Sequence, residues 1–236
     1  MSVARFRQTA PSGRRGGAGP GSGLFLALPL ILLFALGFLT LAYVIYVLWP
    51  RWPVAPVAVD APALPIVVAG VTFNVPPAAM RVAVQRRPGT PERIDLAFLW
   101  PSLAPPGPQA RPTGERVFVT IAAAAGTLPP AERLKVIYPR YTAGDPQPAP
   151  EGLASFAFRD GSPYQGEDLF VDASEPESFA ARCTRDRGPQ APGTCLLDRR
   201  IGEADITVRF ARAWLADWRA LATGLERLVA ALHPGA

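Results

Sequence analysis

The hydrophobic residues of this 236-residue chain are concentrated first in one long run, Leu24–Leu48, which contains no charged side chain. An α-helix rises about 1.5 Å per residue, so roughly 20 apolar residues cross the hydrocarbon core of a bilayer. A cleaved signal peptide is the alternative, but its apolar region is shorter and lacks the interfacial aromatic residues found here. Those residues are Tyr43, Tyr46, Trp49 and Trp52. The pattern therefore predicts an uncleaved transmembrane helix over residues 24–49.

The charges on the two sides of this run differ. Residues 1–23 contain Arg5, Arg7, Arg14 and Arg15 and no acidic residue, whereas only Arg51 follows the run closely. Basic flanks stay in the cytoplasm, so we expect the N-terminus inside and the C-terminal part outside. The same residues are rich in Gly, Ser and Pro, which predicts a disordered basic cytoplasmic tail over 1–23. Heavy use of Ala, Arg and Pro with a single lysine indicates a GC-rich bacterial genome. We therefore expect a single-pass inner-membrane protein with a periplasmic domain.

Beyond the run the pattern changes to short segments with period-two alternation. Five prolines in residues 50–65 predict an extended spacer. In residues 93–100, Ile94, Leu96, Phe98 and Trp100 alternate with other residues and share one face of a strand. Other β-like segments are 66–75, 80–86, 116–124 and the expected hairpin of 153–159 with 167–172. With one short helix expected within 128–141, the pattern predicts a β-rich (α+β) exported domain of antiparallel strands over residues 66–236.

The C-terminal residues 211–232 have the period of an amphipathic helix. Apolar residues recur at spacings of three and four: Trp214, Leu215, Trp218, Leu221, Leu225, Leu228 and Leu232. Such a stripe predicts a helix that covers one face of the antiparallel sheet. A helix that binds a partner protein is the alternative, and it would leave Trp214 or Trp218 substantially exposed.

The chain has two cysteines, Cys183 and Cys195, and both lie on the expected outer side of the membrane. An even number of cysteines in an oxidising compartment predicts a disulfide bond. The polar sequence between them contains two prolines and two glycines, so we expect the bond to connect neighbouring strands across a loop. A redox-active pair is the alternative, although the separation lacks the C-x-x-C geometry of such sites.

The charge balance of the exported part argues against a nucleic-acid partner. Five of the 24 basic residues lie before Trp52 and all 19 acidic residues follow it, so the remainder has nineteen charges of each sign. A neutral domain lacks the basic surface that binds phosphate backbones. The only histidine, His233, is close to the C-terminus, and no phosphate-binding loop or nucleophile motif occurs. We expect no catalytic residue, no metal and no cofactor.

One acidic cluster follows the turn that contains Tyr164. Its members are Glu167, Asp168, Asp172, Glu175 and Glu177. Asp168 and Asp172 would share one face of a strand, and two carboxylates are the usual catalytic groups of glycoside hydrolases. Nearby arginines make solvated, ion-paired acids the preferred interpretation.

Together these patterns predict a bitopic inner-membrane protein whose periplasmic domain binds or assembles with another envelope or membrane protein, in addition to its contact with the lipid bilayer. The residues proposed for the partner surface are Trp214, Trp218, Tyr164, Asp168 and Asp172. A membrane-anchored periplasmic hydrolase that uses carboxylates and a ligand-binding sensor domain remain as alternatives. The sensor alternative predicts a closed apolar cavity between sheet and helix.

Overall fold

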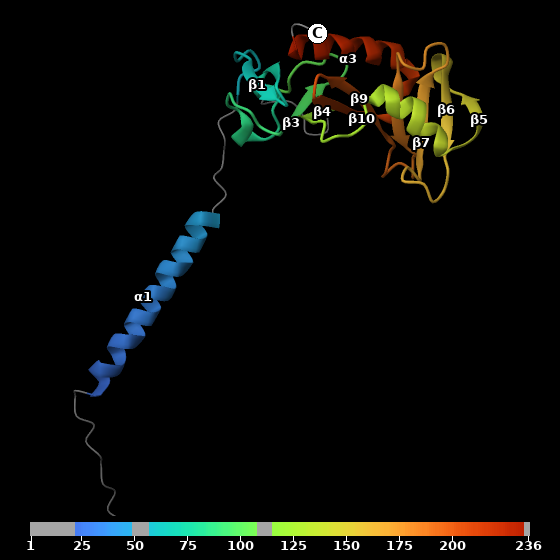
Figure 1. Cartoon of the computed structure of the whole chain (residues 1–236). Coiled ribbons are helices and arrows are strands. Elements are labelled where there is room, and N and C mark those ends of the chain that lie inside the picture. Colours follow the sequence, from blue (N-terminus) through green and yellow to red (C-terminus); the bar gives the residue numbers. More distant parts are fainter. Residues whose placement is uncertain (1–21, 49–56, 108–114, 234–236) are drawn as a thin grey trace, which may run out of the picture. The chain divides into compact units, whose positions relative to one another are not determined.

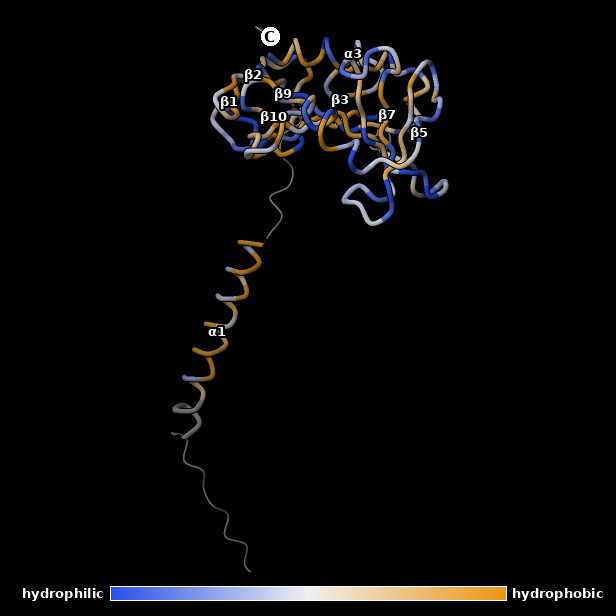
Figure 2. Tube along the Cα trace, turned by 45° about the vertical axis from the view of Figure 1, so that its right-hand side comes forward, coloured by the Kyte–Doolittle hydropathy of each residue, from blue (hydrophilic) through white to orange (hydrophobic). Residues whose placement is uncertain are grey.

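The computed structural model describes residues 22–48, 57–107 and 115–233, and it divides the chain into two compact units, Met1–Val54 and Ala55–Ala236. The first unit contains helix α1, Ser22–Leu48, which is almost entirely hydrophobic (Figures 1 and 2). Within the described residues, Ala27–Leu48 is the one helical segment long and apolar enough to cross a membrane. Its large side chains have no protein around them, with exposed fractions from 42% at Val44 to 79% at Phe34.

The second unit is built on antiparallel strands. Strands β1 (Leu64–Val68) and β2 (Val71–Val75) form a separate hairpin. The other strands form one eight-stranded sheet in the order β3-β4-β10-β9-β8-β7-β6-β5. Their bounds are β3 Arg93–Leu99, β4 Arg116–Ala123, β5 Thr142–Pro148, β6 Leu153–Phe158, β7 Glu167–Asp172, β8 Ala180–Thr184, β9 Thr194–Ile201 and β10 Ala204–Ala211. The predicted α+β class with antiparallel strands is therefore confirmed.

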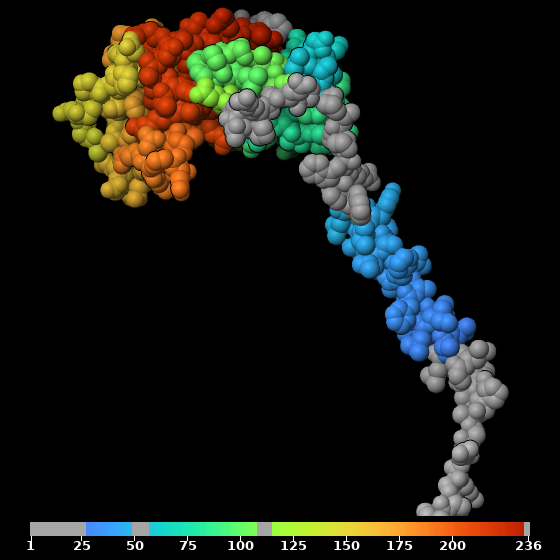
Figure 3. All heavy atoms as spheres, turned by 180° about the vertical axis from the view of Figure 1, so that it is seen from behind, coloured from blue at the N-terminus to red at the C-terminus, as the bar shows by residue number. Residues whose placement is uncertain are grey.

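One face of this sheet packs against the C-terminal helix α3, Trp218–Leu232 (Figure 1). The sequence of β4 gives this face its hydrophobic surface. Val117, Val119 and Ile121 alternate with less buried residues and point to the same side of the sheet. The buried stripe of α3 consists of Trp218, Leu221, Gly224, Leu225, Leu228 and Leu232. In the space-filling view, this last part of the chain (red) lies beside the strands β5 and β6 (yellow) (Figure 3). The hairpin β1–β2 joins the same core through Ile66, Val68 and Phe73.

The opposite face carries a smaller hydrophobic cluster over strands β6 to β8. The chain from Pro130 to Arg140 forms α2 (Pro130–Glu132), a π-helical turn η3 (Arg133–Ile137) and a 3-10 turn η4 (Tyr138–Arg140). This is the short helical segment expected from the sequence. Tyr138, at 6% exposure, packs there against Phe158, Leu169 and Val171.

Two boundaries differ from the prediction. The helix expected from residue 211 begins at Trp218, because Ala211 still pairs with Thr194 in the sheet and a 3-10 segment, η6 (Arg212–Asp217), intervenes. The hairpin β1–β2 replaces the single run 66–75 and begins at Leu64, inside the expected spacer. Residues 1–21 of the expected tail and 50–56 of the expected spacer lie outside the described residues, so these parts stay predictions.

The strand expected over residues 80–86 is wrong. Met80 makes one isolated bridge to Leu96, and the chain then turns through the 3-10 segment η2, Ala83–Gln85. The guanidinium of Arg86 donates a hydrogen bond back to the carbonyl oxygen of Met80. Apolar residues do alternate in this segment, but they do not pack against a neighbouring strand, since Val82 and Val84 are 39% and 69% exposed.

The junction between β8 and β9 is the shortest ladder of the large sheet. Strands β9 and β10 pair over eight residues, whereas β8 and β9 pair only as Arg182 with Leu196 and Cys183 with Cys195. The two cysteines form the predicted disulfide bond, and both are fully buried. The bond thus links the β5–β8 half of the sheet to the β3–β4–β10–β9 half.

Replacing both cysteines, Cys183→Ala with Cys195→Ala, should lower the free energy of unfolding by about 3 kcal/mol, because a ring of about 13 residues is no longer closed in the unfolded chain. Urea unfolding of the purified chain in detergent measures this change. Reductant should destabilise the native chain to a similar degree and leave the double variant unchanged. An unfolding midpoint that neither change moves would contradict a stabilising role for the bond.

Candidate binding surface

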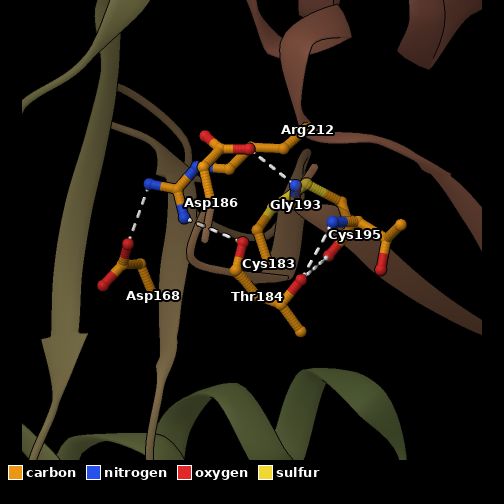
Figure 4. The surroundings of a disulfide bond; sticks show 8 residues. Asp168, Cys183, Thr184, Asp186, Gly193, Cys195 and Arg212 are labelled. Carbon is orange, nitrogen blue, oxygen red and sulfur yellow. Dashed lines mark hydrogen bonds and ion pairs between the residues drawn. A yellow bond between two sulfur atoms is a disulfide. The ribbon is translucent and has the colours of Figure 1, made fainter. Parts of the chain in front are cut away.

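The surroundings of the disulfide bond are held by polar contacts that cross the β8–β9 junction (Figure 4). The backbone N–H of Thr194 on β9 donates to the hydroxyl of Thr184 on β8, at 2.9 Å. The N–H of Gly193 donates to a carboxylate oxygen of Asp186 at 2.6 Å. A side chain at Gly193 would collide with the carbonyl oxygen of Thr184 and with Arg212, so this close approach requires glycine.

Asp168, one of the residues proposed for the partner surface, is the acidic centre of this region. Its two carboxylate oxygens each accept a hydrogen bond at 2.8 Å, one from Nε of Arg185 and one from the guanidinium of Arg212. Arg212 also donates to the carbonyl oxygen of Thr184 and lies over the ring of Phe170. The side chain of Asp168 is 14% exposed. It therefore connects β7 to the start of η6 and has a structural partner on each oxygen.

Asp172, at the other end of β7, has a different set of partners. One carboxylate oxygen accepts hydrogen bonds from the N–H and the hydroxyl of Ser174, at 2.9 and 2.7 Å, and the other accepts one from Ser178. These hydrogen bonds, those of Ser174 first, hold the pKa of Asp172 below its ordinary value. Asp172 thus closes the turn that follows the strand.

The two carboxylates proposed for hydrolysis are not brought together. Asp172 lies four positions after Asp168 on the same strand, which places their Cα atoms roughly 13 Å apart. The carboxyl groups of inverting glycosidases are at most about 9.5 Å apart, and those of retaining enzymes are closer. Because each acid is also bonded to other side chains, this pair gives no support to the hydrolase alternative.

Tyr164 belongs to an aromatic cluster over strands β6 and β7. Its ring contacts those of Tyr138, Tyr141 and Phe158, with centroids 4.8–5.7 Å apart. The guanidinium of Arg182 lies 5.0 Å from the Tyr164 ring and donates to Glu167 at 2.6 Å. Burial raises the pKa of Tyr138, against the opposing charge of Arg182. Tyr164 therefore stabilises its own loop.

The tryptophans of the C-terminal segment are engaged in packing. Trp218 is 4% exposed, and its indole N–H donates to the carbonyl oxygen of Glu151 at 3.1 Å. Trp214 is partly buried and stacks on Trp100 with ring centroids 5.2 Å apart. Neither ring has the exposure that the partner-helix interpretation requires, so the covering role of the helix is the one that its contacts support.

The partners of these residues were not evident in the sequence. Arg212 is 44 residues from Asp168, and the strand register that brings them together depends on the whole sheet. His233, which we expected to have no catalytic role, contacts the carbonyl oxygen of Thr72 through Nδ1 at 2.9 Å and packs on Phe73. It helps to attach the end of α3 to the hairpin β1–β2.

The unit Ala55–Ala236 has a groove and a small cavity among its described residues. A groove of about 240 Å³ lies between α3 and strands β9 and β10, and a cavity of about 50 Å³ lies beneath the segment 130–138. The groove is lined mainly by Leu197, Ile201, Val208, Ala222, Leu225 and Val229. The small cavity is lined by groups that include Tyr138, Arg182 and Asp198. No cluster of three metal-binding side chains occurs among residues 22–48, 57–107 and 115–233.

Comparison with known proteins identifies no family. No protein-family model matches the chain, and no curated protein sequence matches it. Among solved structures it is similar to an immunity protein of the Stenotrophomonas maltophilia type IV secretion system, with 13% identity, 75% of this chain and 98% of that one covered, and a TM-score of 0.49. It is also similar to the iron-regulated outer membrane lipoprotein FrpD of Neisseria meningitidis, with 10% identity, 76% and 96% covered, and a TM-score of 0.46. Likeness at this level supports no functional argument.

The substitution Asp168→Asn should lower the free energy of unfolding by roughly 1–3 kcal/mol, because Arg185 and Arg212 lose a charged acceptor. Asp145→Asn, on the exposed edge strand β5, removes the same charge where the side chain has no ion pair among the described residues, and it should have little effect. Urea unfolding compares the two variants. Equal stability of both would mean that Asp168 does not hold β7 to η6.

Proposed function

We propose that this chain is a membrane-anchored, exported binding protein: α1 spans the inner membrane with its N-terminus in the cytoplasm, and the exported domain works by contact with another envelope protein. The observation that carries the proposal is the exposure of α1. Its large hydrophobic side chains between Leu28 and Leu48 are uncovered by any described part of the chain. A run of this length without protein contacts is stable when lipid surrounds it.

The disulfide bond supports export. Cys183 and Cys195 lie opposite one another at the weakest junction of the sheet, where the bond replaces a longer ladder of hydrogen bonds. Structural disulfides persist in compartments such as the bacterial periplasm and are rare in the cytosol. The orientation comes from the arginines of residues 1–23 and the positive-inside rule.

A binding role, rather than catalysis, is supported by how the candidate side chains are used. Asp168 and Asp172 are bonded separately, and the Cys183 and Cys195 sulfurs are joined. His233 interacts with the backbone of β2. The side chains that could take part in catalysis therefore stabilise the fold. A function of the domain would then depend on contacts made by its surface.

The groove between α3 and strands β9 and β10 favours a second candidate, the ligand-binding sensor. Its apolar lining suits a small hydrophobic molecule, although its volume of about 240 Å³ is below the usual range of ligand pockets, about 300–1,000 Å³. It is a groove at the edge of the helix, whereas the sensor alternative calls for a closed cavity.

Purification of the tagged full-length protein from its own host in mild detergent tests the proposal. We expect a stoichiometric envelope protein to remain bound, as identified by mass spectrometry. A matched control joins residues 1–56 to an unrelated exported domain and should lose that protein, because the partner contacts the native domain. A full-length protein that purifies alone would contradict the binding role and favour the sensor candidate.

A further inference from the structure

The face of the sheet opposite α3 has an aromatic side chain on β4, the strand next to the β3 edge. Phe118 on β4 lies between the buried Val117 and Val119, so it points away from the α3 side. Its neighbours across the ladder are Ala97 on β3 and Arg209 on β10. The segment 130–140 packs on the β6–β9 part of this face. Phe118 is only partly buried, so its ring remains accessible.

Two arginines contact this one ring. The guanidinium carbons of Arg81 and Arg209 each lie 4.9 Å from the centroid of the Phe118 ring, and both side chains are exposed. Since both distances end at the same centroid, the two positive charges are closer together than the Debye length of about 10 Å at 0.1 M salt. The Phe118 ring orients both guanidinium groups, but it does not neutralise their positive charges.

The described part of the chain supplies no direct counterion for these two groups. Neither guanidinium has a hydrogen bond or an ion pair among residues 22–48, 57–107 and 115–233. Asp95 on β3 is near enough for the charge of Arg81 to lower its pKa, yet its oxygens already accept hydrogen bonds from Arg93 and Thr120. Two like charges within about 10 Å of one another, with their donors free, favour the approach of an anion.

Apolar side chains stand beside this charge. Val82 and Val84, which follow Arg81 in the chain, are 39% and 69% exposed. Single exposed valines are common, but these two adjoin an arginine that is oriented by an aromatic ring. Arginine and aromatic side chains are the residue types enriched in the centres of protein–protein interfaces.

We propose that Arg81, Phe118 and Arg209, here called the Arg81–Phe118–Arg209 patch, bind an acidic segment of a partner protein. The inference rests on the proposed binding function and names the chemistry of the partner. Carboxylates fit the planar, two-donor edge of a guanidinium, which a lysine would not offer in the same geometry. Leucine-like side chains beside those carboxylates would contact Val82 and Val84.

The test uses the full-length chain in phosphatidylcholine nanodiscs and a fluorescent peptide of alternating Glu and Leu. Fluorescence anisotropy should detect binding that weakens as salt is raised. The same peptide with Gln in place of Glu should bind at least about tenfold more weakly, because it lacks the charges that the patch attracts. The double variant Arg81→Glu with Arg209→Glu should lose Glu–Leu peptide binding.

The matched control is Arg140→Glu with Arg159→Glu, which changes the net charge equally at two exposed positions outside the patch. It should bind the Glu–Leu peptide like the native chain. If the Glu double variant is unfolded by circular dichroism, Arg81→Gln with Arg209→Gln replaces each arginine by a shorter, neutral polar side chain without adding a negative charge, and it should show the same loss. Equal binding of both peptides, or an equal loss in the control variant, would overturn the proposal.

Anionic vesicles separate a lipid surface from a protein segment. Vesicles that contain phosphatidylglycerol should carry down equal amounts of nanodiscs with the native chain and nanodiscs with the patch variant. Patch-dependent vesicle binding without peptide binding would overturn the proposal in favour of a membrane contact. The pull-down and the peptide measurement can fail separately. If the patch variant still captures the envelope partner, this inference is wrong and the proposed function stands. If the native protein purifies alone yet binds the peptide, the proposed function is wrong.

Discussion

The covalent bond between Cys183 and Cys195 is the constraint on which the folded unit Ala55–Ala236 depends most. In the eight-stranded sheet, β8 and β9 pair at only two positions, and the disulfide bond occupies one of them. The hydrogen bonds of Thr194 to Thr184 and of Gly193 to Asp186 support the same junction, but they form only when the strands are already in place. The fold therefore favours a compartment where cysteines are oxidised, as expected of an exported domain.

Charged side chains stabilise the β8–β9 junction. Because acids of the cluster have this structural role, the cluster does not indicate a catalytic or binding site. Asp168 joins Arg185 and Arg212 across the junction, and Asp172 stabilises a turn. The α3 face of the sheet is occupied by the core, and Trp214 and Trp218 belong to that packing. The opposite face is covered over β6 to β9 by the segment 130–140. Near Phe118 on β4, the guanidinium groups of Arg81 and Arg209 contact the ring and have no hydrogen bond or ion pair among the described residues.

Local pattern predicts much of this structure, and tertiary contacts decide the rest. Alternation predicted strands such as β3 and β4, and the i, i+3, i+4 spacing predicted the buried stripe of α3, because burial imposes those periods directly. The same alternation gave a wrong strand at residues 80–86, where Val82 and Val84 have no neighbouring strand to pack against. The pairs Asp168 with Arg212 and Arg81 with Phe118 depend on strand register over long separations, so no sequence pattern indicates them. The cysteine pair was predictable because chemistry alone restricts its partners.

The central claim is that the chain is anchored in the membrane with its disulfide-bonded domain outside, and the oxidation state of its cysteines in intact cells tests this most directly. Cells are quenched in acid, and membranes washed with carbonate are treated with a maleimide polymer before and after reduction. The account predicts that the full-length chain stays in the washed membranes and shifts on a gel only after reduction. Free thiols before reduction, or release of the intact chain by carbonate, would contradict it.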